Sequence, residues 1–319
     1  MLFSRRMDAY RWVGFHPLMP SSKSPYLIMA VLSGVLWGSA GIFVRILGDW
    51  GMDGATIVFS RVLIAVFIMG ALILVTDRRM FRIKMSDLWI FIVCALSMVL
   101  LNLFYTISVG GASLSLAAVL LSMSPAFMLL MARALFGERI TRRKTGCMLL
   151  AIIGCILVSG LLEDPGSVSA EGIGAGIAAA FFYAFYGIMS KRAASGGYST
   201  YTILFYCILF SAIVLLPFSD LNAVVEYGSE GLGSIALLVI QALFSSVLPY
   251  IFYTVAVTKG EAGTGSLLAA CGEPMAAAAF GLAFFTEIPS PLMILGMLLA
   301  VVSIAVMCSP DGKNEHPCR

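Results

Sequence analysis

The sequence has little charge. Only 12% of its 319 residues are Asp, Glu, Lys or Arg, whereas 60% are hydrophobic and the mean hydropathy is +0.99. A water-soluble domain carries about 25% charged residues. So much apolar surface cannot be buried in one soluble core, and most of it must face lipid or other helices. The formal net charge of +3 is small, and we expect no nucleic-acid partner.

Residue types that build catalytic and metal sites are also scarce. The two histidines, His16 and His316, lie in the terminal segments, and none of the seven cysteines belongs to a C-x-x-C pair. The sequence contains no H-E-x-x-H, no G-x-S-x-G and no G-x-x-x-x-G-K-[ST] motif. We therefore expect neither an enzyme nor an ATP-driven pump, and no cofactor or metal.

The sequence contains long runs of apolar residues. A helix needs about 20 mostly apolar residues to cross about 30 Å of hydrocarbon. These runs lack the alternation of barrel strands, and lipid-exposed backbone must satisfy its own hydrogen bonds, so helices are predicted. Ten stretches qualify: 26–44, 55–76, 88–109, 112–135, 146–162, 172–189, 201–218, 233–257, 263–285 and 292–308.

The basic residues predict the orientation of these spans, because cytoplasmic loops are enriched in Lys and Arg. If the N-terminus is inside, the inward segments hold 17 of the 20 basic residues: Arg5, Arg6, Arg11, Lys23, Arg78, Arg79, Arg82, Lys84, Arg139, Arg142, Arg143, Lys144, Lys191, Arg192, Lys259, Lys313 and Arg319. The outward loops hold no lysine, and their charges are acidic: Asp49, Asp53, Glu163, Asp164, Glu171, Asp220, Glu226 and Glu230. Both termini of a multi-pass cell-membrane protein are thus predicted to be cytoplasmic, with residues 1–24 as a lead-in and 309–319 as a tail.

The chain repeats itself. Residues 104–138 and 252–287 both begin with F-Y-T, reach a proline about twenty residues later, and end on a glutamate thirteen residues after that proline. These prolines are Pro125 and Pro274. The repeat divides the chain into two five-span units, 25–162 and 172–308. Because five is odd, the second unit must be inverted in the membrane, as in many secondary transporters.

These features resemble the EamA-type family of the drug/metabolite transporter superfamily. The likeness rests on the repeated proline-to-glutamate pattern and the Glu273–Pro274 pair, and it covers about residues 26–308. The resemblance implies an all-α integral membrane protein with ten transmembrane helices in a 5+5 inverted-topology repeat. It also implies a central cavity and export of small metabolites.

The two prolines are expected to lie near the bilayer midplane, about 20 Å from the glutamates that end their segments. Proline removes a backbone donor and clashes with the carbonyl four residues back. We therefore predict helix breaks at Pro125 and Pro274 that line a shared polar cavity. A simple packing kink is the alternative. The two end glutamates, Glu138 and Glu287, are predicted to be structural boundary residues.

A charged side chain at the bilayer centre costs about 2.5–3.5 kcal/mol on insertion scales. The presence of Glu273 at this depth therefore calls for an explanation. Its best predicted partner is Arg61. Three interpretations remain open: a structural ion pair, a gate or substrate-binding pair, or Glu273 alone binding a cation or carrying a coupling proton. Polar and aromatic side chains at similar depth are candidates to complete the cavity: Trp37, Asn102, Tyr105, Ser122, Ser124, Tyr183, Tyr186, Tyr250 and Tyr253.

The leading functional hypothesis is a secondary exporter of small metabolites, such as amino acids, whose opposite charges would meet Arg61 and Glu273. The alternative is an exporter of cationic drugs or other toxic organic molecules, which would depend on Glu273 and the aromatic rings. The substrate, its direction of movement, the coupling ion and the oligomeric state do not follow from the sequence.

Overall fold

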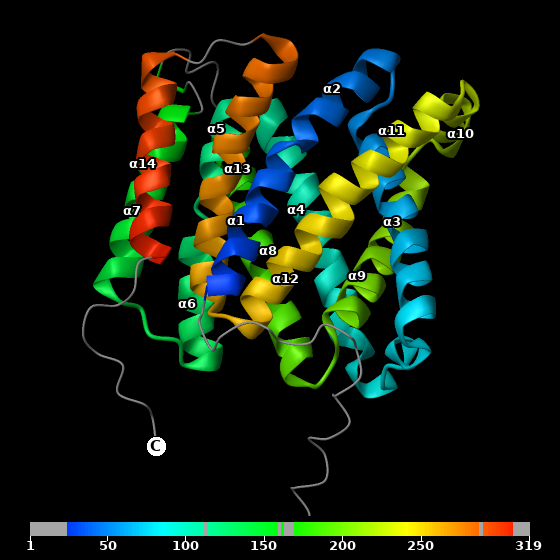
Figure 1. Ribbon diagram of the computed structural model, residues 1–319, viewed down its shortest axis with the longest axis horizontal. Helices are drawn as coiled ribbons and strands as arrows, with labels where there is room; N and C mark the ends of the chain where they lie inside the picture. Colours follow the sequence, from blue (N-terminus) through cyan, green and yellow to red (C-terminus); the bar gives the residue numbers. More distant parts are fainter. Residues whose placement is uncertain (1–23, 112–113, 159–160, 163–168, 287–289, 309–319) are drawn as a thin grey trace, which may run out of the picture.

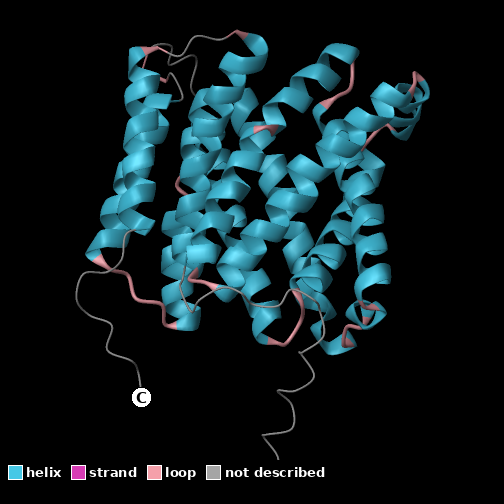
Figure 2. Cartoon of the chain, in the orientation of Figure 1, coloured by secondary structure: helices cyan, strands magenta, loops and turns pink. Residues whose placement is uncertain are grey.

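A computed structural model describes residues 24–111, 114–158, 161–162, 169–286 and 290–308. Every regular element in these residues is helical (Figure 2). The first half contains α1 (Ser24–Gly38), α2 (Ala40–Trp50), α3 (Gly54–Thr76), α4 (Leu88–Gly111), α5 (Leu114–Leu121), α6 (Ser124–Phe136) and α7 (Arg142–Val158). The second half contains α8 (Ala170–Ser195), α9 (Thr200–Leu215), α10 (Leu221–Ser229), α11 (Leu232–Ala242), α12 (Leu248–Lys259), α13 (Ala262–Phe285) and α14 (Pro291–Cys308). The predicted lead-in 1–24 (except Ser24), the tail 309–319 and Glu287 lie outside the described residues.

Eight helical segments within the described residues are long and apolar enough to cross a membrane: Pro25–Trp50, Gly54–Thr76, Met85–Ser108, Val119–Phe136, Ala170–Ser195, Thr200–Phe218, Leu232–Lys259 and Ala262–Phe284. They coincide with eight of the ten predicted spans. The other two predicted spans correspond to α7, which has 17 residues and opens on charged side chains, and to the shorter apolar α14. These two helices lie side by side at one edge of the bundle (Figure 1). Ten transmembrane helices therefore stay a prediction.

The helix breaks differ from those expected. The predicted break in the fourth span is present, because Ser122 and Met123 form a turn between α5 and α6, and Pro125 occupies the first turn of α6. Proline is favoured there because the first helical N–H groups need no partner within the helix. The prediction of a second break at Pro274 is wrong, since α13 continues through this residue.

The packing of α1 explains why α13 tolerates Pro274. Glycines let the backbones of the two helices approach closely. A Cβ atom added to Gly38 would lie only 2.6 Å from the carbonyl oxygen of Glu273, and one added to Gly34 would collide with the carbonyl oxygen of Ala269. The continuous face of α1 thus supports α13 on both sides of the proline, and a supported membrane helix can lose one hydrogen bond without breaking.

Two further interruptions were not predicted. Ser39 forms a turn between α1 and α2. A π-helical turn, η6 (Leu243–Val247), joins α11 to α12 just before Pro249. Such turns insert one extra residue into a helix and often occur at functional sites. The π turn lies in the same span as Tyr250, and it brings Ser246 to the pocket described below.

Candidate functional site

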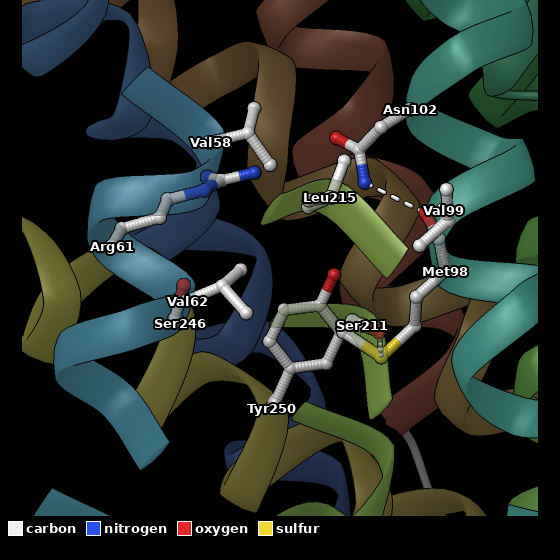
Figure 3. Close-up of a pocket in the computed structure, with 10 residues that line it drawn as sticks. All are labelled: Val58, Arg61, Val62, Met98, Val99, Asn102, Ser211, Leu215, Ser246 and Tyr250. Atoms are coloured by element: carbon white, nitrogen blue, oxygen red, sulfur yellow. Dashed lines mark hydrogen bonds between the residues drawn. The ribbon is translucent and has the colours of Figure 1, made fainter. Parts of the chain in front are cut away.

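The pocket around Arg61 lies between α3, α4, α9 and the segment formed by η6 and α12 (Figure 3). Its volume of about 10 Å³ is close to what one water molecule needs. The guanidinium of Arg61 and the hydroxyl of Tyr250 point into the same space, and Asn102 faces them from α4 (Figure 3). The ten lining residues are Val58, Arg61, Val62, Met98, Val99, Asn102, Ser211, Leu215, Ser246 and Tyr250.

The guanidinium of Arg61 has no partner among the described residues. Its Nε atom is buried without a hydrogen bond, and no salt bridge joins Arg61 to any described carboxylate. Two nearby polar groups are already engaged elsewhere. The amide nitrogen of Asn102 donates to the carbonyl of Met98 at 2.7 Å, and the hydroxyl of Ser211 donates to the carbonyl of Cys207 at 2.8 Å.

Glu273 lies on α13 and is half-buried. Its carboxylate and the guanidinium of Arg61 form no salt bridge within the described residues. The direct ion pair considered from the sequence is therefore not made here.

An aromatic cluster joins these two regions. The ring of Trp37 on α1 contacts Tyr250 and Tyr253 on α12 and Tyr183 on α8, with centroid distances of 5.0, 5.3 and 5.7 Å. Tyr186 extends the cluster, with ring distances of 5.6 Å to Tyr250 and 6.3 Å to Tyr253. Because Tyr250 also lines the Arg61 pocket, the cluster and the pocket form one continuous candidate site.

Hydroxyl groups in this core are incompletely hydrogen-bonded. The hydroxyls of Tyr183, Tyr253 and Ser246 are buried and make no hydrogen bond to the described part of the protein. The hydroxyl of Tyr186, by contrast, lies 3.1 Å from Thr254 Oγ1. Buried polar groups usually have partners, so these three hydroxyls have donor and acceptor capacity to offer a polar ligand.

The remaining predicted residues lie apart from the cluster. Tyr105, half-buried on α4, is not part of the ring cluster around Trp37. Ser122 donates to the carbonyl of Val119 at 2.6 Å, within its own helix turn. Pro125 begins α6, and Pro274 follows Glu273 inside α13. Ser211 and Ser246 line the pocket but were not selected from the sequence.

A second charged site lies at the face predicted to be cytoplasmic. The carboxylate of Glu138 accepts from Lys191 Nζ at 2.5 Å and from the backbone N–H groups of Ala262 and Gly263 at 3.0 and 3.4 Å. Lys191 also donates to the carbonyl of Gly260 at 3.2 Å. This Glu138 junction connects the end of α6, the helix α8 and the N-terminus of α13, where a negative charge is favourable.

The sequence of this chain is similar to those of known transporters. The model of the EamA-like transporter family matches residues 24–160 and 170–309. Two curated relatives are pseudopaline exporters CntI of Pseudomonas aeruginosa. The protein of strain UCBPP-PA14 is 29% identical over 203 residues, and that of strain PAO1 is 28% identical over 201 residues. Each alignment covers 62% of this chain and 67% of the relative.

A known crystal structure superimposes on this chain with a TM-score of 0.76 at 16% identity, and the match covers 90% of this chain and 97% of the other. This likeness concerns the fold alone. The family model covers most of the chain in two successive matches, in agreement with the repeat seen in the sequence. The chain belongs to the EamA-like transporter family.

Proposed function

We propose that this protein is a secondary transporter that exports small metabolites, such as amino acids or related compounds, across the cell membrane by alternating access. The observation that carries the proposal is the continuous core site, in which a half-buried arginine and a half-buried glutamate flank one aromatic cluster. Charged side chains at such depth in membrane proteins usually mark a substrate or ion pathway. Relatives described as pseudopaline exporters support outward movement of a small organic molecule.

The proposed cycle uses ten helices as two inverted five-helix units, with both termini cytoplasmic. A rearrangement of the helices around the core site would expose it to each side in turn. Arg61 and Glu273 would bind opposite charges of the substrate, and Trp37, Tyr183, Tyr250 and Tyr253 would pack against its body. Asn102, Tyr105 and Ser122 would contribute polar contacts as the site opens, and Pro125 and Pro274 would set the helix geometry around it. Glu273 is the candidate for a coupling proton.

Export of cationic drugs is the second candidate function. The ring contacts among Trp37, Tyr183 and Tyr253 favour it, because aromatic faces attract cations. In this case Glu273 would supply the negative charge, and Arg61 would have no role in binding.

Counterflow in proteoliposomes separates the two candidates. The purified full-length chain is tested with a panel of labelled amino acids and a panel of organic cations, together with Arg61→Ala and Glu273→Gln. Exchange of amino acids that is abolished by Arg61→Ala supports the metabolite exporter. Exchange of cations alone, unaffected by Arg61→Ala, supports the drug exporter. Arg133→Ala is the matched control, because Arg133 is exposed on α6.

A further inference from the structure

We propose that the Arg61 pocket is a carboxylate-binding subsite, with Arg61, Tyr250 and Ser246 as its donors, so that the transported molecule must carry a carboxylate. This inference rests on the proposed transport function and deepens it, because it assigns one chemical group of the substrate to one set of side chains.

The first support is the unbalanced charge of Arg61. A guanidinium has five N–H donors, and here none of them is used within the described residues. A buried charge that lacks a partner is strongly unfavourable. Two other cations within the described residues are paired: Lys191 with Glu138 at 2.5 Å, and Lys144 with Glu261 at 2.8 Å. Arg61 therefore has the properties expected of a side chain whose counter-ion arrives with a ligand.

The second support is the composition of the pocket wall. No acidic side chain is among its ten lining residues, and Arg61 is the one cationic residue among them. The hydroxyl of Ser246 is buried without a partner among the described residues, and the hydroxyl of Tyr250 points into the same pocket as the guanidinium (Figure 3). Hydroxyl and guanidinium donors facing one space suit an anion, and Arg binds a carboxylate through two parallel hydrogen bonds. A cation would find no matching charge in this pocket.

The charge balance favours a carboxylate over a phosphate. One guanidinium matches a group of charge −1. A phosphate ester carries about −1.5 to −2 at neutral pH, which is more negative charge than one guanidinium neutralises. Because Tyr250 also belongs to the aromatic cluster, the rest of a bound carboxylate compound would extend from the pocket toward Trp37.

The pocket must widen for binding. Its volume of about 10 Å³ suits a single water molecule, whereas a carboxylate has two oxygens and a carbon. The π turn that positions Ser246 borders the pocket, so the donor arrangement can adjust at a place where the helix is already irregular. The present conformation is accordingly closed around the subsite.

Matched compounds test the inference directly. Amino acids that the wild-type protein exchanges in proteoliposomes are each compared with the amide and the decarboxylated amine of the same side chain, and with the corresponding deaminated acid. The subsite predicts that amides and amines are not exchanged and that only compounds with a carboxylate compete. Exchange of amides and amines as readily as acids would overturn the carboxylate subsite while leaving the transporter function intact. Failure of every carboxylate and every amine to exchange would overturn both.

Variants locate the group that binds the carboxylate. Arg61→Gln should weaken competition by carboxylates at least about 30-fold, because it removes one partner of a buried charge pair. Arg61→Lys keeps the charge but loses the bidentate geometry, so its affinity should lie between those of the wild type and Arg61→Gln. Tyr250→Phe removes only the hydroxyl and should weaken the same compounds about 10-fold.

Folding controls keep the outcome decisive. Gel filtration and the unfolding temperature establish that each variant is folded, and Arg133→Gln should retain wild-type competition. Equal affinity of folded Arg61→Gln and wild type for acids would exclude Arg61 as the carboxylate ligand. A uniform loss for acids, amides and amines would also overturn the subsite, since it would show a general effect on the transport cycle.

Discussion

Lys191 and Arg61 are both cations within the protein, but their surroundings are opposite. The ammonium of Lys191 contacts the Glu138 carboxylate and the carbonyl of Gly260, and it lies 5.4 Å from the ring of Phe136. The guanidinium of Arg61 has no such partner. A cation whose partners belong to the fold stabilises that fold, whereas a cation without partners is available to a ligand. This contrast is the reason to assign Lys191 to the fold and to propose Arg61 as a ligand-binding residue.

The largest expected effect is at the Glu138 junction. Glu138→Ala removes the acceptor of the ion pair and of two backbone N–H groups. It leaves Lys191 without its carboxylate, which costs about 3–5 kcal/mol for a buried pair. Thermal unfolding in detergent should show a large loss of stability. Glu138→Ala combined with Lys191→Met should recover part of it, and Glu226→Ala on the exposed face of α10 should have almost no effect. A stable Glu138→Ala protein would remove the distinction between the two cations.

A smaller loss of stability is expected where α1 packs against α13 beside Glu273. Gly38→Ala places a methyl group 2.6 Å from the carbonyl oxygen of Glu273, and such overpacking costs about 1–3 kcal/mol. The matched control is Gly41→Ala, because a Cβ atom there meets nothing within 4 Å. This control should be neutral or slightly stabilising. Equal unfolding temperatures for both variants would contradict the close contact between α1 and α13.

The helix that carries Arg61 should show a pH-dependent effect of about 1 kcal/mol. Asp53 caps α3, and its carboxylate accepts from Thr56 N at 2.9 Å and from Thr56 Oγ1 at 2.7 Å. The hydrogen bond from the Thr56 backbone holds the pKa of Asp53 below its ordinary value. The cap therefore contributes fully above the unfolded-state pKa of about 3.9, and its contribution is lost as the pH falls through the folded-state value.

Two substitutions at this position test the sign. Asp53→Ala should lower stability at neutral pH by about 1 kcal/mol. Asp53→Asn keeps a capping side chain without a titrating group, so its stability should fall less steeply than that of the wild type below about pH 4. Parallel acid unfolding curves for wild type and Asp53→Asn would show that the cap is not titrated.

The smallest expected loss of stability is at Arg61. Arg61→Gln replaces a charge that has no partner in the fold with a neutral side chain, so the free energy of unfolding should not decrease. Transport should nevertheless be lost. Thermal unfolding and counterflow measured on the same preparation provide the comparison. If Arg61→Gln is as unstable as Glu138→Ala, the arginine is a structural residue.

The fold was predictable where the information is local. The span predicted at 55–76 is Gly54–Thr76 in the structure, and the span predicted at 263–285 is Ala262–Phe285. Length and hydrophobicity determine such limits, and they depend on no other part of the chain. Whether the helix breaks at each of the two prolines depends on packing against distant parts of the chain. The segment before Pro125 breaks, whereas Pro274 lies in a helix supported by α1, which is more than 200 residues away in the chain.

The candidate site was predictable in its residue types but not in its contacts. Depth in the predicted spans selected Trp37 and Tyr250, and the structure places their rings in contact. The same criterion selected Tyr105, which lies outside the ring cluster. Ser246 could not be found because its position depends on a π turn that has no simple sequence signal. The partners of Glu138 were equally hidden, since they lie 53 or more residues away along the chain.

The close glycine contact between α1 and α13 has a mechanical consequence. With no side chain between the backbones at Gly34 and Gly38, neither helix can slide along the other without a collision, so a shift of one carries the other. Trp37 on α1 and Glu273 on α13 therefore travel together. A molecule that contacts both residues therefore binds to one rigid surface. The helices that move toward it must come from the other side of the site, where α3 carries Arg61 and α4 carries Asn102.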